Sequence, residues 1–114
     1  MLILSRGIIM ILIINNKKYN IKNMNTFFKR FIGNMFKLKI NDILLFETNS
    51  IHTFFCFKKM DIIMLDKGYR VKYVFKNFKI FHIILPKKDV KYVLELPVGK
   101  INIKINDTLN IKRN

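Results

Sequence analysis

Apolar and polar positions alternate through much of the second half of the chain, as they do in strands that bury one face. Residues 69–73 and 101–105 alternate strictly between large apolar and polar side chains. Other runs are short, almost wholly apolar and rich in β-branched or aromatic residues, which is typical of more deeply buried strands. These runs lie at 43–47, 53–57, 62–65 and 92–96. The pattern predicts a succession of short strands separated by turns.

The first apolar stretch predicts a hairpin. Residues 11–14 are apolar, 15–18 read Asn-Asn-Lys-Lys, and 19–22 alternate again. Asparagine tolerates the positive φ that a tight turn requires, so the chain is expected to reverse there.

The residues before this hairpin are apolar but few. Residues 1–10 are either an N-terminal extension or part of the first strand, and translation starts at Met1 or at Met10. Because the apolar run 1–14 is too short to cross a bilayer and is interrupted by Arg6, a membrane partner is not favoured. We expect a cytoplasmic protein, with a membrane-anchored or exported protein as the minor alternative.

Only one segment has the spacing of a helix. Apolar residues four apart follow Thr26, which is a suitable N-cap, and Gly33 provides a C-terminal stop. The sequence therefore predicts an all-β fold, a single β-barrel or jelly-roll-like sandwich of about eight short strands, with one short helix near residues 26–33. With 114 residues the chain suits a single domain, which we place at 11–112.

Charge adds a possible partner to this picture. The formal net charge is +15, from 22 Lys+Arg against 7 Asp+Glu, and such a field attracts phosphate groups. The chain is also rich in Ile, Lys and Asn, the composition that codon bias produces in an AT-rich genome, so part of the excess is expected to be solvated surface. Aromatic and lysine residues interleave at 75–79, as in single-strand binders, although such rings are more often core residues.

Three polar residues in an apolar frame are the candidate ligand-binding group: His52, Thr53 and Asp61. A carboxylate beside an imidazole fixes its tautomer and raises its basicity, which would suit a ligand-binding corner or a general base. The alternative is structural, with His52 bonded to a backbone carbonyl and Asp61 capping a turn. Cys56, the single cysteine, is expected to be a small buried hydrophobe.

Other polar residues are expected to have structural roles. Glu95 lies between two leucines and should face away from them or pair with a cation, for which Arg30 on the predicted helix is the candidate. Asp107 belongs to a predicted turn. No zinc-ligand spacing, phosphate loop or dinucleotide motif occurs, so we expect no metal and no cofactor.

Several segments, taken in order, resemble a family of small bacterial and archaeal proteins, domain of unknown function 192. Its Arg-x-x-Gly-Leu-Met is similar to Arg-Phe-Ile-Gly-Asn-Met at 30–35, and its His-Thr-Phe-Phe-Met to His-Thr-Phe-Phe-Cys at 52–56. Its Leu-Glu-Leu-Pro-Ala-Gly is similar to Leu-Glu-Leu-Pro-Val-Gly at 94–99. Its Pro-Ile-Asp resembles this chain only at Asp61, because Lys-Met stands here in place of Pro-Ile. The resemblance implies a β-barrel-like or jelly-roll-like domain and no particular activity.

These observations favour a binding or accessory module with a polar pocket near His52 and Asp61, for which a small molecule would be the ligand. A basic nucleic-acid-associated protein is the alternative, and an enzyme of unknown class using His52 and Asp61 is a further one. The sequence leaves open whether there is any catalysis.

Overall fold

The computed structural model describes residues 9–23, 43–52, 59–78 and 83–113. The first described feature is a tight hairpin between β1 (Ile9–Ile14) and β2 (Lys17–Asn23). At its tip Asn15 and Asn16 have φ values of 51° and 65°, as a two-residue turn between right-twisted strands requires. The predicted hairpin is therefore confirmed, with a turn of two residues where the sequence suggested four.

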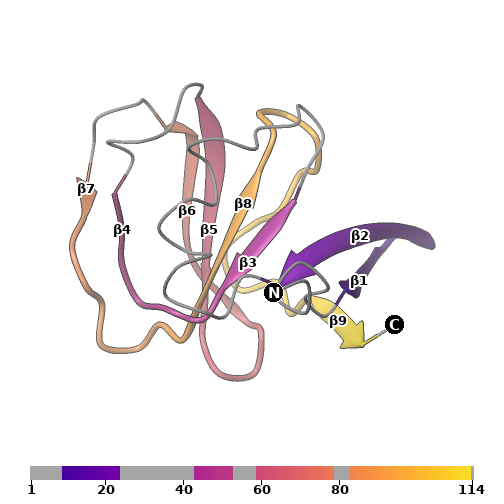
Figure 1. Ribbon diagram of the computed structural model, residues 1–114, viewed down its shortest axis with the longest axis horizontal. Coiled ribbons are helices and arrows are strands. Elements are labelled where there is room, and N and C mark those ends of the chain that lie inside the picture. Colours follow the sequence, from indigo (N-terminus) through magenta and orange to yellow (C-terminus); the bar gives the residue numbers. More distant parts are fainter. Residues whose placement is uncertain (1–8, 24–42, 53–58, 79–82, 114) are drawn as a thin grey trace, which may run out of the picture.

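Seven strands form one mixed sheet, in the order β6-β5-β8-β3-β2-β1-β9 (Figure 1). All neighbouring pairs are antiparallel except β2 and β3, which run parallel. A separate antiparallel ribbon pairs β4 with β7 and is drawn to the left of β6 and β5 in Figure 1. The remaining bounds are β3 (Leu44–Phe46), β4 (Ile51–His52), β5 (Met60–Leu65), β6 (Val71–Phe78), β7 (Ile83–Ile84), β8 (Tyr92–Leu96) and β9 (Asn110–Arg113).

The sheet curls but its strands do not close into a barrel, because β6 and β9 stand at opposite ends of the strand order. The chain just before β9 nevertheless reaches the chain just before β6. A bridge joins Arg70 to Thr108, and the Val71 N–H donates to the Asp107 carbonyl at 2.8 Å. The Leu109 N–H donates to the Tyr69 carbonyl at 2.9 Å. These contacts bring the two ends of the sheet together without a continuous ladder.

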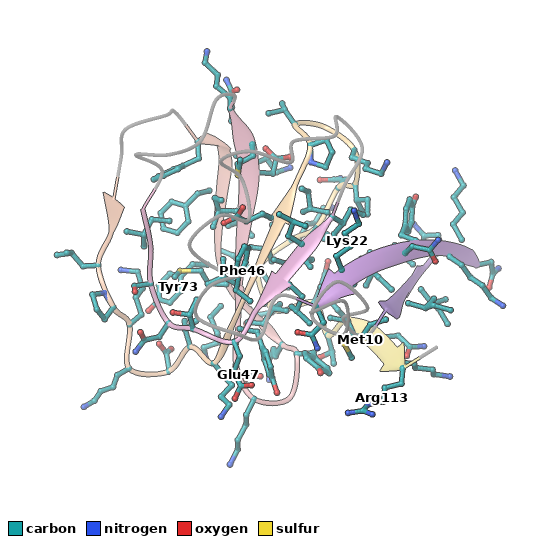
Figure 2. The ribbon with its side chains drawn as sticks, in the orientation of Figure 1. Met10, Lys22, Phe46, Glu47, Tyr73 and Arg113 are labelled. Carbon is teal, nitrogen blue, oxygen red and sulfur yellow. The ribbon has the colours of Figure 1, made fainter. Side chains whose placement is uncertain are left out.

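Each face of the central strands covers a hydrophobic core. One face, which we call the inner face, packs against β1, β2 and the 101–111 segment; its central members are Ile43, Leu45, Ile63, Leu65, Leu94 and Leu96. The other, which we call the ribbon face, meets Ile84 of β7; its members from the sheet are Leu44, Phe46, Met60, Ile62, Met64 and Val93. Figure 2 shows Phe46 and Tyr73 between the sheet and β4.

The all-β class is confirmed, and the residues that the structure describes contain no helix. The predicted helix at 26–33 and the whole of the predicted strand at 53–57 lie outside the described residues. The prediction of a strand at 101–105 is wrong, because these residues do not pair in a sheet. Ile101 and Ile103 are buried as the alternation suggests, but Ile105 is 57% exposed. Turns at each end of this segment, Lys100 N–H to Pro97 carbonyl and Asp107 N–H to Lys104 carbonyl, leave it as an extended connection.

Candidate functional site

Asp61 lies at the start of β5 and is 3% exposed. Both oxygens of its carboxylate accept backbone N–H groups: the Asn77 N–H donates to Oδ1 at 2.8 Å, and the Gly99 N–H donates to Oδ2 at 3.0 Å. The carboxylate therefore joins the start of β5 to the end of β6 and to the turn after β8. Such charge-assisted bonds are among the stronger ones in proteins.

Local backbone geometry explains how these two N–H groups reach Asp61. The β5–β6 register shifts between Met60 and Ile62, so Asp61 lies in a bulge, where a ladder is locally disrupted. Asn77 and Gly99 both have positive φ values, of 55° and 73°, which turn their N–H groups away from regular strand directions. The observed contacts give Asp61 the turn-capping role that the sequence held open as one of two alternatives.

Glu95 lies at the next rung of the same strand pair but on the opposite face. Asp61 stands opposite Leu96 in the β5–β8 register, whereas Glu95 stands opposite Ile62 on one side and Leu44 on the other. This places the Glu95 side chain on the ribbon face, away from Leu94 and Leu96, as its flanking leucines predicted.

The Glu95 carboxyl is deeply buried and only partly satisfied. The residue is 3% exposed, and its Oε1 has no hydrogen-bond partner among the residues that the structure describes. Burial raises the pKa of Glu95 to about 8, since an apolar environment disfavours the charged form. At neutral pH this carboxyl is therefore mostly protonated and can both donate and accept a hydrogen bond.

Of the residues that the sequence grouped into one pocket, the structure describes the backbone of His52 and the whole of Asp61. His52 ends β4, where its backbone pairs with Ile83 of β7, so it does not share a ladder with Asp61. Thr53 lies outside the described residues, as do Cys56 and Arg30. The grouping of His52, Thr53 and Asp61, and the pairing of Arg30 with Glu95, stay predictions.

Two exposed aspartates organise turns. The Lys104 N–H donates to Asp107 Oδ2 at 2.9 Å, which is the structural use expected for a turn aspartate. Asp66, in the turn between β5 and β6, accepts the N–H groups of Gly68 at 2.8 Å and Arg70 at 3.0 Å. The bond from Arg70 is the main reason that the pKa of Asp66 is lowered. The signal in the sequence was Asp-Lys-Gly, a common turn composition.

Within the described ranges, no three His, Cys, Asp or Glu side chains gather in a way that could hold a metal ion. Within the same ranges there is also no helix long and apolar enough to cross a membrane.

These features define a small all-β domain with a mixed, strongly curled sheet, a carboxylate clamp at Asp61 and a buried carboxyl at Glu95. The sequence matches the DUF192 family, described as "Uncharacterized ACR, COG1430", over residues 10–111. The chain therefore belongs to this family, and the resemblance seen in the sequence is confirmed.

Relatives in archaea support the assignment. A UPF0127 protein of Thermococcus kodakarensis is 41% identical over 88 residues, which cover 71% of this chain and 55% of that protein. A UPF0127 protein of Thermococcus sibiricus is 37% identical over 100 residues, which cover 79% of this chain and 64% of that protein. The chain thus spans a little over half the length of the curated relatives it matches.

Two solved bacterial structures share the fold. A protein of unknown function from Novosphingobium aromaticivorans has a TM-score of 0.69 at 18% identity, covering 90% of this chain and 83% of that one. A putative transcription regulator from Sinorhizobium meliloti has a TM-score of 0.67 at 15% identity, covering 93% and 92%. At these identities the likeness establishes the fold alone.

Proposed function

We propose that the protein is a small binding or accessory module that holds a small molecule on the ribbon face beside Glu95, with the predicted pocket residues His52 and Thr53 next to it and Asp61 supporting it from the opposite face of the same strand pair. The observation that carries this proposal is Glu95 Oε1, a buried oxygen for which the described part of the chain offers no hydrogen-bond partner. Buried polar atoms in native proteins nearly always have partners, so a donor or acceptor is expected at this position in the working protein.

The surroundings of Glu95 suggest what the ligand would be. Its cross-strand neighbours Leu44 and Ile62 are fully buried and apolar. A carboxyl that is protonated at neutral pH complements a neutral group with both a donor and an acceptor, such as a carboxamide. The proposed ligand therefore has an apolar body and one or two neutral polar groups, as is usual for ligands in mainly apolar pockets.

The neighbouring elements would frame such a site. Asp61 fixes the rung of β5 next to Glu95 by its two backbone bonds, which would hold the wall of the site rigid. β4, which His52 ends, pairs with β7, and Ile84 of β7 packs on the ribbon face. Catalysis by a His52–Asp61 pair has less support, because both Asp61 oxygens already accept backbone N–H groups.

The proposal is tested by a thermal-shift screen of small amides, alcohols, amines and carboxylic acids. The parent is compared with Glu95→Leu, which removes the carboxyl, and with Asp107→Ala, a matched loss of an exposed carboxylate. We expect at least one compound to raise the Tm of the parent and of Asp107→Ala by about 4 °C or more at a large excess over its Kd, and not that of Glu95→Leu.

The competing arrangement is an internal partner for Glu95, for which Arg30 is the sequence candidate. Arg30→Met distinguishes the two: it would leave ligand-induced shifts intact if the ligand satisfies Glu95. If no compound separates the parent from Glu95→Leu, and Arg30→Met destabilises only a chain that retains Glu95, the binding proposal is wrong and the carboxyl is structural.

A further inference from the structure

Basic and acidic side chains are divided unevenly among the strands. The strands β1, β2 and β9 carry no acidic residue and five basic ones, at positions 17, 18, 22, 112 and 113. Elsewhere in the described chain, two lysines form ion pairs. The Lys91 Nζ lies 3.1 Å from Glu47 Oε2, and the Lys72 Nζ lies 3.8 Å from Asp89 Oδ2. By contrast, the basic residues of these three strands have no acidic residue on the same strands.

The registers of these strands place most of that charge on one face. Ile11 stands opposite Asn20 of β2 and Lys112 of β9, and Ile13 stands opposite Lys18 and Asn110 in the same way. Cross-strand partners share a face, so these residues line one surface with the isoleucines along its middle. The polar members are exposed, whereas Ile11 and Ile13 are half-buried. We call this surface the outer face.

The opposite side of the same three strands belongs to the core. Met10, Leu12 and Ile21 are all buried there, and Tyr19, opposite Leu12, packs against them. Lys22 lies on the outer face at the far end of β2, opposite Ile9 (Figure 2). The outer face is therefore the solvent side of a sheet whose other side is anchored. Its lysines are Lys18 and Lys22 on β2 and Lys112 on β9. Two strand spacings separate β2 from β9, roughly 10 Å.

We propose that the outer face binds the phosphate backbone of nucleic acid, chiefly through Lys18, Lys22 and Lys112. These ammonium groups lie on either side of a shallow apolar stripe, and each can contact one phosphate. The exposed amides of Asn20 and Asn110 can donate to phosphate oxygens between them. All of these contacts are to the backbone, so the proposed binding does not depend on base sequence.

The composition of the outer face argues for this partner over two others. It presents no aromatic ring, since Tyr19 faces the core, and so it has no platform on which bases could stack. It also presents no large exposed apolar side chain: in the described residues these are Leu85, Val98 and Ile105, none of them on β1, β2 or β9. A membrane-surface site would need such an anchor beside its lysines.

The rings that the sequence offered as a stacking surface are also placed elsewhere. Phe75 and Phe78 lie 5.9 Å apart in an edge-to-face arrangement and pack against the core of the ribbon face. A nucleic-acid site on these strands would therefore have to be electrostatic, and its affinity should fall steeply with salt. Three phosphate contacts predict a slope of about −3 in log K against log salt on duplex DNA.

The test measures binding of the full chain to a fluorescent 20-base-pair duplex by anisotropy across a salt series. The double variant Lys18→Glu with Lys112→Glu, called the outer-face variant, reverses the charge of the outer face. The control variant, Lys67→Glu with Lys104→Glu, changes the net charge by the same amount at exposed turn positions. We expect the outer-face variant to lose at least about tenfold in affinity and to lower the salt slope by about 2, whereas the control variant loses less than about threefold. Matching Tm values for the parent and both variants show that each is folded.

Three results would overturn the proposal. Equal losses in both double variants would mean that the net charge acts diffusely, without a site. Tighter binding to phosphatidylserine-containing vesicles than to the duplex, lost in the outer-face variant, would identify a membrane surface as the partner. A preference among duplex sequences that survives at high salt would contradict backbone recognition.

Discussion

Asp61 and Glu95 are two carboxyl groups at adjacent rungs of β5 and β8, equally buried, and they differ in almost every other respect. Asp61 faces the inner side and has a backbone donor for each oxygen. Glu95 faces the ribbon side among apolar neighbours, and one of its oxygens has none. The comparison teaches that the directed N–H groups around a carboxyl, and not its burial alone, decide whether it stabilises a fold or strains it.

The largest expected effect on stability comes from removing the Asp61 carboxyl, whose two oxygens both have donors. Asp61→Ala removes the acceptor of two N–H groups at once, and bonds to a charged acceptor contribute about 1.5–3 kcal/mol each. We expect the free energy of unfolding, measured by urea denaturation, to fall by about 4 kcal/mol. Asp107→Ala, which removes one exposed acceptor, should cost about 1 kcal/mol. Similar losses for the two variants would contradict the clamp.

The second prediction concerns pH and Glu95. Its folded-state pKa of about 8 lies above the unfolded value of 4.5, so the folded state keeps a proton that the unfolded state loses. The free energy of unfolding should therefore fall as pH rises from about 5 to 8, by up to about 1.4 kcal/mol per pH unit, and level off above that.

Glu95→Leu should abolish this slope and raise the free energy of unfolding at pH 8 by about 2 kcal/mol, because it replaces an unsatisfied buried carboxyl by an apolar group. Denaturation of the parent and the variant at four pH values checks both points. A variant that is less stable than the parent at every pH would show that Glu95 has an internal donor, with Arg30 the first candidate to test.

A smaller effect sharpens the role of the turn that serves Asp61. Gly99 has a φ of 73°, and a Cβ placed there would meet nothing within 4 Å, so Gly99→Ala carries only the backbone cost of the left-handed conformation. We expect a loss of about 1 kcal/mol. Gly68→Ala, where a Cβ would lie 3.6 Å from Asp66 Oδ1 and φ is not left-handed, should be near neutral. Equal Tm values for the two variants would be the contrary result.

The smallest effect is expected from a surface ion pair. The Lys91 Nζ lies 3.1 Å from Glu47 Oε2, and both side chains are about half exposed. A double-mutant cycle with Glu47→Ala and Lys91→Ala should give a coupling below about 0.5 kcal/mol that disappears in 0.5 M salt. A coupling as large as the effect of Asp61 would mean that exposed carboxylates matter here as much as buried ones.

The sequence predicted those parts of the fold that short-range rules control. The period-two patterns and apolar runs located β5, β6 and β8, and the asparagines at 15 and 16 located the first turn, because each depends on residues close together in the chain. The extended segment 101–105 has the same alternation as a strand, but no neighbour forms a ladder with it. Alternation reports which side chains are buried and does not report hydrogen bonding.

The candidate site was harder to predict because its contacts are long-range. Asp61 is bonded to residues 16 and 38 positions away, and no local pattern announces that Asn77 and Gly99 will present their N–H groups to it. For Glu95 the flanking leucines gave the correct face, since a strand alternates, but they could not show that Leu44 and Ile62 would be its neighbours on both sides. The net charge of the chain can be counted from the sequence. Which lysines share one sheet face could be known only from the register of β1 with β2 and β9.

The parallel junction between β2 and β3 has a mechanical consequence. Within the described residues its ladder has two rungs, Lys22 with Leu44 and Asn23 with Leu45, next to the bond from the Lys22 N–H to the Ile43 carbonyl. When the chain is pulled or opens spontaneously, this is where the β1–β2–β9 unit should unzip from the remaining strands. Amide protons at the junction should then exchange with deuterium sooner than those along β5 and β8.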